Sequence, residues 1–78
     1  MELVITTNPT PECYLISVTG EVDISNASKL RDAIDFALEQ PTEEVKLDFA
    51  EVSYIDSTGI GVLVGAAHHA EEHGKRFV

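Results

Sequence analysis

The chain is poor in cysteine, aromatic residues and positive charge, and it has no long apolar run. Its 78 residues include one cysteine, no tryptophan, and five basic against fourteen acidic residues, for a formal net charge of −9. A lone Cys13 excludes an internal disulfide and fits a reducing compartment, and we interpret it as a small packing residue. So acidic a surface disfavours nucleic acid and anionic membrane surfaces, and favours a protein partner with a basic patch.

Membrane and export signals are also missing. Residues 1–5 lack the basic start and apolar core of a signal peptide, and the longest apolar run, residues 60–67, is interrupted by glycines and too short to span a bilayer. We therefore expect a cytoplasmic protein. Hydrophobic residues make up 44% and charged residues 24%, which is typical of one globular domain, here residues 1–78.

The N-terminal part of the chain predicts two strands. A short apolar run at residues 3–5 is broken by a proline-rich turn at residues 8–11, and a second strand follows at residues 13–18 and ends at Gly20. The short connection indicates an antiparallel pair. Both faces of the second strand carry apolar side chains, so we expect it to be central in the sheet.

The rest of the chain alternates helix and strand. Helical periodicity at residues 26–40 is followed by a strand at 45–49, an irregular piece at 51–55, a helix at about 58–73 and a nascent strand at 75–78. Ser25 or Asn26 suits the N-cap of the first helix. The inward faces should carry Leu30, Ile34, Ala37 and Leu38 on the first helix, and Ile60, Leu63, Val64, Ala67 and Ala70 on the second.

These elements give an α/β domain with a mixed β-sheet in the order β-β-α-β-α-β. The crossover helix makes the second and third strands parallel, in the usual right-handed sense. Because the fourth strand barely begins before Val78, we expect a domain truncated at its C-terminal end. An incomplete sheet has an open edge, which suggests a homodimer through that edge.

The turn at residues 56–59, Asp-Ser-Thr-Gly, is the best candidate site. Ser57 lies at a helix start, where backbone amides lack partners and the helix dipole is positive. A simpler interpretation, favoured by local composition, is that Asp56 or Ser57 only caps the helix. A second polar cluster, Glu21 and Asp23, ends the second strand. Neighbouring parallel strands end at one edge, so both clusters should form one acidic neighbourhood, unless the second is merely a solvated turn.

Two other patterns in the sequence have simpler explanations than a catalytic or nucleotide-binding site. His69, Glu72 and His73 match the His-x-x-Glu-His zinc protease pattern, but the match is short, and we expect a solvated polar face and no metal. The glycines at 59, 61 and 65 fit neither dinucleotide nor P-loop spacing, so we expect them to let the second helix pack close to the sheet.

Residues 45–49, 52–55 and 56–63 resemble the signature of the STAS domain, a family of sulphate transporters and bacterial anti-sigma factor antagonists. The family's other landmark matches residues 20–23, so the resemblance covers essentially the whole chain. It implies a STAS-like fold that normally continues beyond the fourth strand with a further helix and strand.

The resemblance also implies a function, that of a phosphorylation-controlled partner switch that regulates transcription. The unphosphorylated antagonist binds an anti-sigma factor that is also a serine kinase. The kinase phosphorylates the serine that matches Ser57, the complex dissociates, and a PP2C-type phosphatase resets the switch. The protein would be neither an enzyme nor a cofactor carrier. The neighbourhood that binds the partner would comprise Glu21, Asp23, Asn26, Asp56, Thr58 and Gly59.

Two alternatives remain. A STAS regulatory module of a transporter or lipid-trafficking complex would share the fold, although such modules usually lack the serine or follow a membrane region. A metal-dependent hydrolase would use His69, Glu72 and His73. Which sigma factor, kinase or signal is involved does not follow from the sequence.

Overall fold

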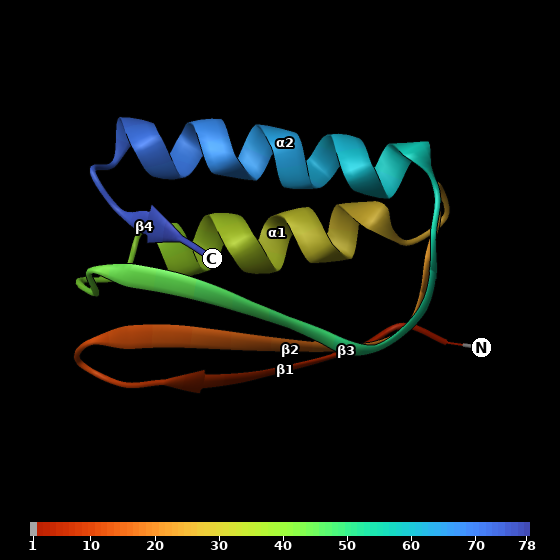
Figure 1. Cartoon of the computed structure of the whole chain (residues 1–78), viewed down its shortest axis with the longest axis horizontal. Helices are drawn as coiled ribbons and strands as arrows, with labels where there is room; N and C mark the ends of the chain where they lie inside the picture. The colour runs from red at the N-terminus through yellow and green to blue at the C-terminus, as the bar shows by residue number, and fades with distance from the viewer. Residues whose placement is uncertain (1) are drawn as a thin grey trace.

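The computed structural model describes residues 2–78, which form a four-stranded mixed sheet with both helices on one side of it (Figure 1). The elements are β1 (Val4–Pro9), β2 (Cys13–Val22), α1 (Ala27–Leu38), β3 (Glu44–Ile55), α2 (Ser57–Glu72) and β4 (Arg76–Phe77). Strand order in the sheet follows chain order. β1 is antiparallel to β2, whereas β3 is parallel to both β2 and β4. The α/β class and the element order are confirmed.

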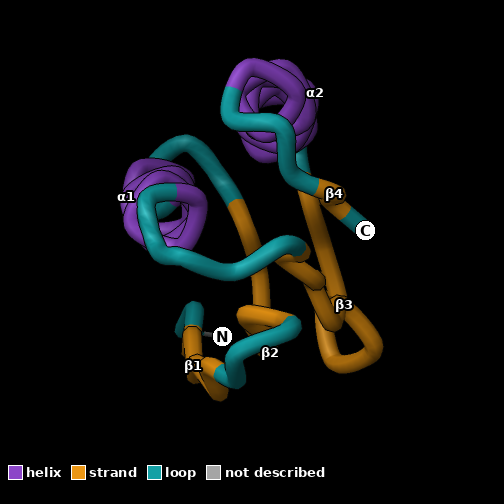
Figure 2. The backbone as a smooth tube through the Cα atoms, turned by 90° about the vertical axis from the view of Figure 1, so that its left-hand side faces the viewer, coloured by secondary structure: helices purple, strands orange, loops and turns teal. Residues whose placement is uncertain are grey.

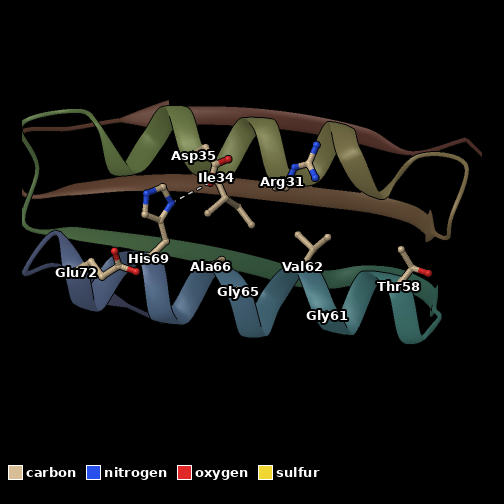
Figure 3. A pocket seen from close by; sticks show the side chains of 10 residues that line it. All are labelled: Arg31, Ile34, Asp35, Thr58, Gly61, Val62, Gly65, Ala66, His69 and Glu72. Carbon is tan, nitrogen blue, oxygen red and sulfur yellow. Dashed lines mark hydrogen bonds and ion pairs between the residues drawn. The ribbon is translucent and has the colours of Figure 1, made fainter.

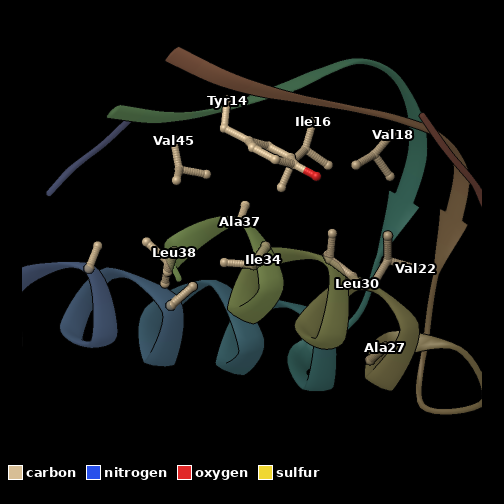
Figure 4. Packing of buried hydrophobic residues seen from close by; sticks show 12 residues of the cluster. Tyr14, Ile16, Val18, Val22, Ala27, Leu30, Ile34, Ala37, Leu38 and Val45 are labelled. Atoms are coloured by element: carbon tan, nitrogen blue, oxygen red, sulfur yellow. The ribbon is translucent and has the colours of Figure 1, made fainter. Parts of the chain in front are cut away.

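The core lies between β2 and α1. Tyr14, Ile16 and Val18 alternate along β2 and are buried, as alternation on one face of a strand requires. They face the apolar stripe of α1, which Figure 4 shows in close-up, and the predicted inward side of α1 is confirmed. The fully buried residues of this stripe are Leu30, Ile34, Ala37 and Leu38.

The third strand is longer than its sequence pattern predicts, and the irregular piece expected at residues 51–55 is wrong. β3 runs unbroken to Ile55, because its pairing with β2 continues through two register shifts. On β2, one shift lies between Ser17 and Thr19 and the other between Gly20 and Glu21. Each shift places an extra β3 residue against β2, which disrupts the period-2 pattern without ending the ladder.

Gly20 does not end β2, contrary to the sequence expectation. It lies inside the strand at φ +106°, a conformation that side chains rarely adopt. A Cβ there would also collide with the carbonyl oxygen of Glu2. The glycine therefore lets the strand bend and continue to Val22, which places the end of β2 beside the start of α2.

The inward face of α2 also differs from the prediction. Ala70 is buried and Leu63 is half-buried against the core, as predicted. Ile60, Val64 and Ala67 are exposed, whereas Gly59 and Ala66, which were not predicted inward, are buried. This difference follows from where the two helices lie. Because α1 covers the centre of the sheet, α2 packs alongside α1 over the β3–β4 side (Figure 2). The fully buried positions of α2 are therefore small residues, while Val62 and Leu63 are half-buried and Ile60 and Val64 stay exposed.

The chain ends in a short fourth strand, as predicted. β4 pairs with Glu44 and Val45, and Val78 extends the ladder by donating its N–H to the Val45 carbonyl at 3.0 Å. In the part of the chain that the structure describes, neither helix is long and apolar enough to cross a membrane.

Candidate functional site

Asp56 joins the start of α2 to the turn that follows β2. It is the N-cap of α2, and its Oδ1 accepts the backbone N–H of Gly59 at 3.0 Å. Its Oδ2 accepts the backbone N–H of Ile24 at 3.1 Å, and its own N–H donates to the Val22 carbonyl at 3.1 Å. One carboxylate thus caps the helix and holds the neighbouring turn. The capping interpretation is confirmed for Asp56, and Ser57 is the first helical residue.

Ser57 and Thr58 are both exposed in the first turn of α2. The N–H groups of the first helical residues have no partner within the helix, and the dipole makes this end positive. An anionic group on Ser57 would therefore lie at the favourable end of the helix. The serine hydroxyl takes no part in the capping bonds, which Asp56 makes alone.

Gly59 fixes how closely this helix start approaches the sheet. A Cβ on Gly59 would lie 2.6 Å from Cγ1 of Ile55 and 2.8 Å from Cγ1 of Val22. The expectation that glycines permit close packing therefore holds for Gly59. It is wrong for Gly61 and Gly65, where a Cβ would meet nothing within 4 Å.

The turn at residues 23–26 has its own hydrogen bonds. Oδ1 of Asp23 accepts both the N–H of Ser25 at 2.9 Å and its Oγ–H at 2.5 Å. These bonds, first the one from the Ser25 hydroxyl, hold the pKa of the Asp23 carboxyl below its ordinary value. Asp23 therefore stays charged at neutral pH and adds a fixed negative charge to the site.

Asn26 supports the same turn from the other side. It occupies the N-cap position of α1, but its side chain makes no capping bond to the helix. Instead its Oδ1 accepts the N–H of Asp23 at 2.9 Å, and its Nδ2 donates to the Glu21 carbonyl at 2.9 Å. Asn26 thus ties the end of β2 to the start of α1.

The structure brings the two predicted clusters together. Asp56 bonds directly to both sides of the turn that carries Asp23, and Glu21 joins this network through its backbone carbonyl. Sequence reasoning missed Ile24, whose side chain is 80% exposed. The signal that marks it is an isoleucine between polar residues in a turn, where apolar β-branched residues are uncommon.

A groove of about 500 Å³ runs between α1 and α2 (Figure 3). Nδ1 of His69 on α2 lies 3.2 Å from Oδ1 of Asp35 on α1 and bridges the two helices. The groove reaches Thr58 at the end that carries the candidate site, and its remaining lining residues are Arg31, Ile34, Gly61, Val62, Gly65, Ala66 and Glu72.

Each of the two histidines of the zinc protease pattern has its Nδ1 in a contact within the fold. His69 pairs with Asp35, and Nδ1 of His73 lies 2.9 Å from the His69 carbonyl oxygen. Among residues 2–78, no group of three or more histidine, cysteine or acidic side chains is placed to hold a metal ion. The geometry therefore gives the hydrolase alternative no support.

Solved structures with this fold include anti-sigma factor antagonists. Unphosphorylated SpoIIAA matches with a TM-score of 0.78 and 25% identity over 95% of this chain and 69% of its own. Phosphorylated SpoIIAA of Bacillus also matches with a TM-score of 0.78 and 25% identity, over 96% and 69% of the two chains. A STAS domain from Rhodobacter sphaeroides reaches 0.81 at 14% identity, over 96% and 82%. The molecule is thus an α/β domain of the STAS type.

Sequence comparison agrees. The family described as "Mlab, STAS domain" matches residues 5–78. An anti-sigma-B factor antagonist of Staphylococcus epidermidis is 32% identical over 77 residues, 99% of this chain and 71% of the relative. An anti-sigma-B factor antagonist of Listeria monocytogenes is 43% identical over 51 residues. These residues cover 65% of this chain and 45% of the relative. The chain belongs to the STAS domain family, and the resemblance seen in its sequence is confirmed.

Proposed function

We propose that the chain is an anti-sigma factor antagonist that works as a phosphorylation-controlled partner switch, with Ser57 as the phosphoacceptor. The observation that carries this proposal is the position of Ser57, exposed at the first residue of α2 and directly after the capping Asp56. Relatives named as anti-sigma-B factor antagonists, and a similar fold solved in unphosphorylated and phosphorylated forms, support it.

The switch has two states. Without phosphate, the chain binds an anti-sigma factor that is also a serine kinase, and the sigma factor is released. The kinase then transfers the γ-phosphoryl group of ATP to Oγ of Ser57; the hydroxyl proton is lost and ADP leaves. The complex dissociates, and a PP2C-type phosphatase hydrolyses the phosphoserine and restores the binding state.

Charge explains why phosphorylation would release the partner. A phosphate on Ser57 adds about −1.5 to −2 charges at neutral pH to a site that already holds Asp23 and Asp56. A phosphate charge and a carboxylate about 7 Å apart repel by roughly 2 kcal/mol at an effective dielectric constant of about 20. Both carboxylates belong to the same chain, so affinity falls only by the increase in this repulsion when the interface excludes water, about tenfold for each 1.4 kcal/mol of increase. Burying the extra charge in an interface adds to the cost.

The test is phosphotransfer in a purified system. The chain is incubated with ATP and an anti-sigma factor, starting with the anti-sigma-B factor of Staphylococcus epidermidis and the anti-sigma factors of the chain's own genome. Mass spectrometry locates the phosphate. We expect one phosphate on Ser57, none on Ser57→Ala, and unchanged binding of that variant to the kinase.

Neighbouring hydroxyls supply the controls. Ser25→Ala and Thr58→Val remove the two other exposed hydroxyls of the site and should still be phosphorylated at Ser57. Full phosphate stoichiometry on Ser57→Ala would refute the assignment. Stable binding to an anti-sigma factor that ATP does not release would instead favour a STAS module of a transporter or lipid-trafficking complex.

A further inference from the structure

Ile24 is an apolar side chain in a place where folding gains little from it. It is 80% exposed, more than the other large exposed hydrophobic residues of the described chain. It stands between Asp23 and Ser25 in the turn after β2, where small polar residues are the usual choice. Since so little of the side chain is buried in the free protein, the remaining apolar surface is available to a partner.

The backbone of Ile24 is nevertheless fixed. Its N–H donates to Oδ2 of Asp56 at 3.1 Å, while Oδ1 of the same carboxylate caps α2 through Gly59. The N–H of Ile60, itself 51% exposed, donates to the Asp56 carbonyl at 3.0 Å. The backbones of two exposed isoleucines are thus hydrogen-bonded to the aspartate that directly precedes Ser57, the candidate phosphoacceptor.

We propose that Ile24 is a specificity-determining contact for the serine kinase, and that Asp56 is the positioning residue that fixes Ile24 relative to Ser57. This inference rests on the proposed function. The kinase surface that fits has an apolar pocket for Ile24 with lysine or arginine at its rim, because Asp23 directly precedes Ile24, the Asp56 carboxylate accepts the backbone N–H of Ile24, and the chain carries a net charge of −9.

The structure also sets the expected size of the effect. Burying an isoleucine side chain that is largely exposed in the free protein corresponds to about 10- to 100-fold in affinity. Because the backbone of Ile24 is already held by Asp56, binding need not order that backbone, and more of this gain is retained. Removing it should raise KM for the chain as a kinase substrate and leave kcat unchanged, because Ile24 does not touch the reacting atoms.

The experiment measures steady-state phosphorylation of Ser57 by the kinase with ATP. We expect Ile24→Ser to raise KM at least tenfold without changing kcat or Tm, and Ile24→Val to restore most of the affinity. Phe36→Ser is the matched control, because Phe36 is 58% exposed in the last turn of α1, away from the turn at residues 23–26. A KM within twofold of the wild type for Ile24→Ser, or an equal loss for Phe36→Ser, would overturn the proposal.

Asp56→Asn tests the positioning role. Asparagine keeps an oxygen that can cap Gly59 but places an amide donor against the N–H of Ile24. We expect KM to rise in the wild-type background and to change little further in the Ile24→Ser background. Equal effects in both backgrounds would show that Asp56 does not act through Ile24.

The same assay separates this inference from the proposed function. Wild-type chain that no anti-sigma kinase phosphorylates would overturn the proposed function, and this inference with it. Normal phosphorylation of Ser57 with unchanged KM for the Ile24 and Asp56 variants would overturn only the inference.

Discussion

Gly59 offers a sharp test of how the site is built, because it lies where α2 comes closest to the sheet. A Cβ at this position would lie 2.6 Å from Cγ1 of Ile55, 3.1 Å from its Cδ1 and 2.8 Å from Cγ1 of Val22. Val22 is fully buried, and as a β-branched residue it has little rotamer freedom with which to move aside. The substitution Gly59→Ala must therefore push the helix start away from the sheet.

Two opposing effects decide the magnitude. Overpacking a well-filled site costs about 1–3 kcal/mol. Alanine in place of glycine inside a helix returns up to about 1 kcal/mol. With the full gain subtracted, Gly59→Ala is expected to destabilise the fold by up to about 2 kcal/mol, and in a domain of this size Tm falls by roughly 4–8 °C per kcal/mol.

Thermal and urea denaturation measure the change, and the same helix supplies matched controls. At Gly61 and Gly65 an added Cβ meets nothing within 4 Å, so alanine there should raise stability by up to about 1 kcal/mol. Gly59→Ala and Gly61→Ala should therefore move Tm in opposite directions. If Gly59→Ala is as stable as Gly61→Ala, the close approach of α2 to Val22 and Ile55 is not what the structure indicates.

Three further predictions concern single groups. Asp56→Ala should lower stability by about 1–2 kcal/mol in urea denaturation, and Asp56→Asn by much less, because asparagine also caps helices. The pKa of Asp23 lies below its ordinary value of 3.8, so its carboxylate stabilises the fold above that pH and the contribution is lost as pH falls through the lower pKa. An NMR titration should show this midpoint rising in Ser25→Ala; an unmoved midpoint would contradict the bond. Desolvation raises the pKa of the Cys13 thiol, and a hydrogen bond with Glu44 raises it further. Glu44→Gln should therefore lower this pKa and increase the thiolate fraction, so that iodoacetamide reacts faster with the variant than with the wild type at pH 8.

The periodicity of apolar residues predicts a helix or strand correctly where the element packs or pairs without irregularities. The stripe of α1 was predictable because a helix over the centre of a sheet must bury one apolar face, and Leu30, Ile34 and Leu38 recur at helical spacing. The C-terminal half of β3 was not predictable from periodicity, because two bulges shift its register against β2. Neither Gly20 nor Ser53 reveals this pairing in the sequence.

The face of α2 was mispredicted for a different reason. Ile60 and Val64 are more hydrophobic than Gly59 and Ala66, yet the smaller pair is buried. Hydrophobicity ranks the gain from burial, but a helix that packs against α1 and the sheet edge is also limited by the space available. Only the tertiary arrangement shows that small residues are required there, and that an apolar stripe remains outside.

The two interpretations of the candidate turn, a helix cap and a phosphoacceptor site, prove compatible once the atoms are placed. The capping bonds to Gly59 and Ile24 both come from the Asp56 carboxylate and leave the Ser57 hydroxyl out. The helix start therefore does not depend on that hydroxyl, and a phosphate can be added without unfolding the first turn. At the positive end of α2 a phosphate on Ser57 would be stabilised in the free chain, while in the proposed complex it would have to be desolvated in the site that also holds Asp23. Phosphorylation at this position would thus favour the free chain over the bound one with the fold unchanged, which is what a reversible partner switch requires.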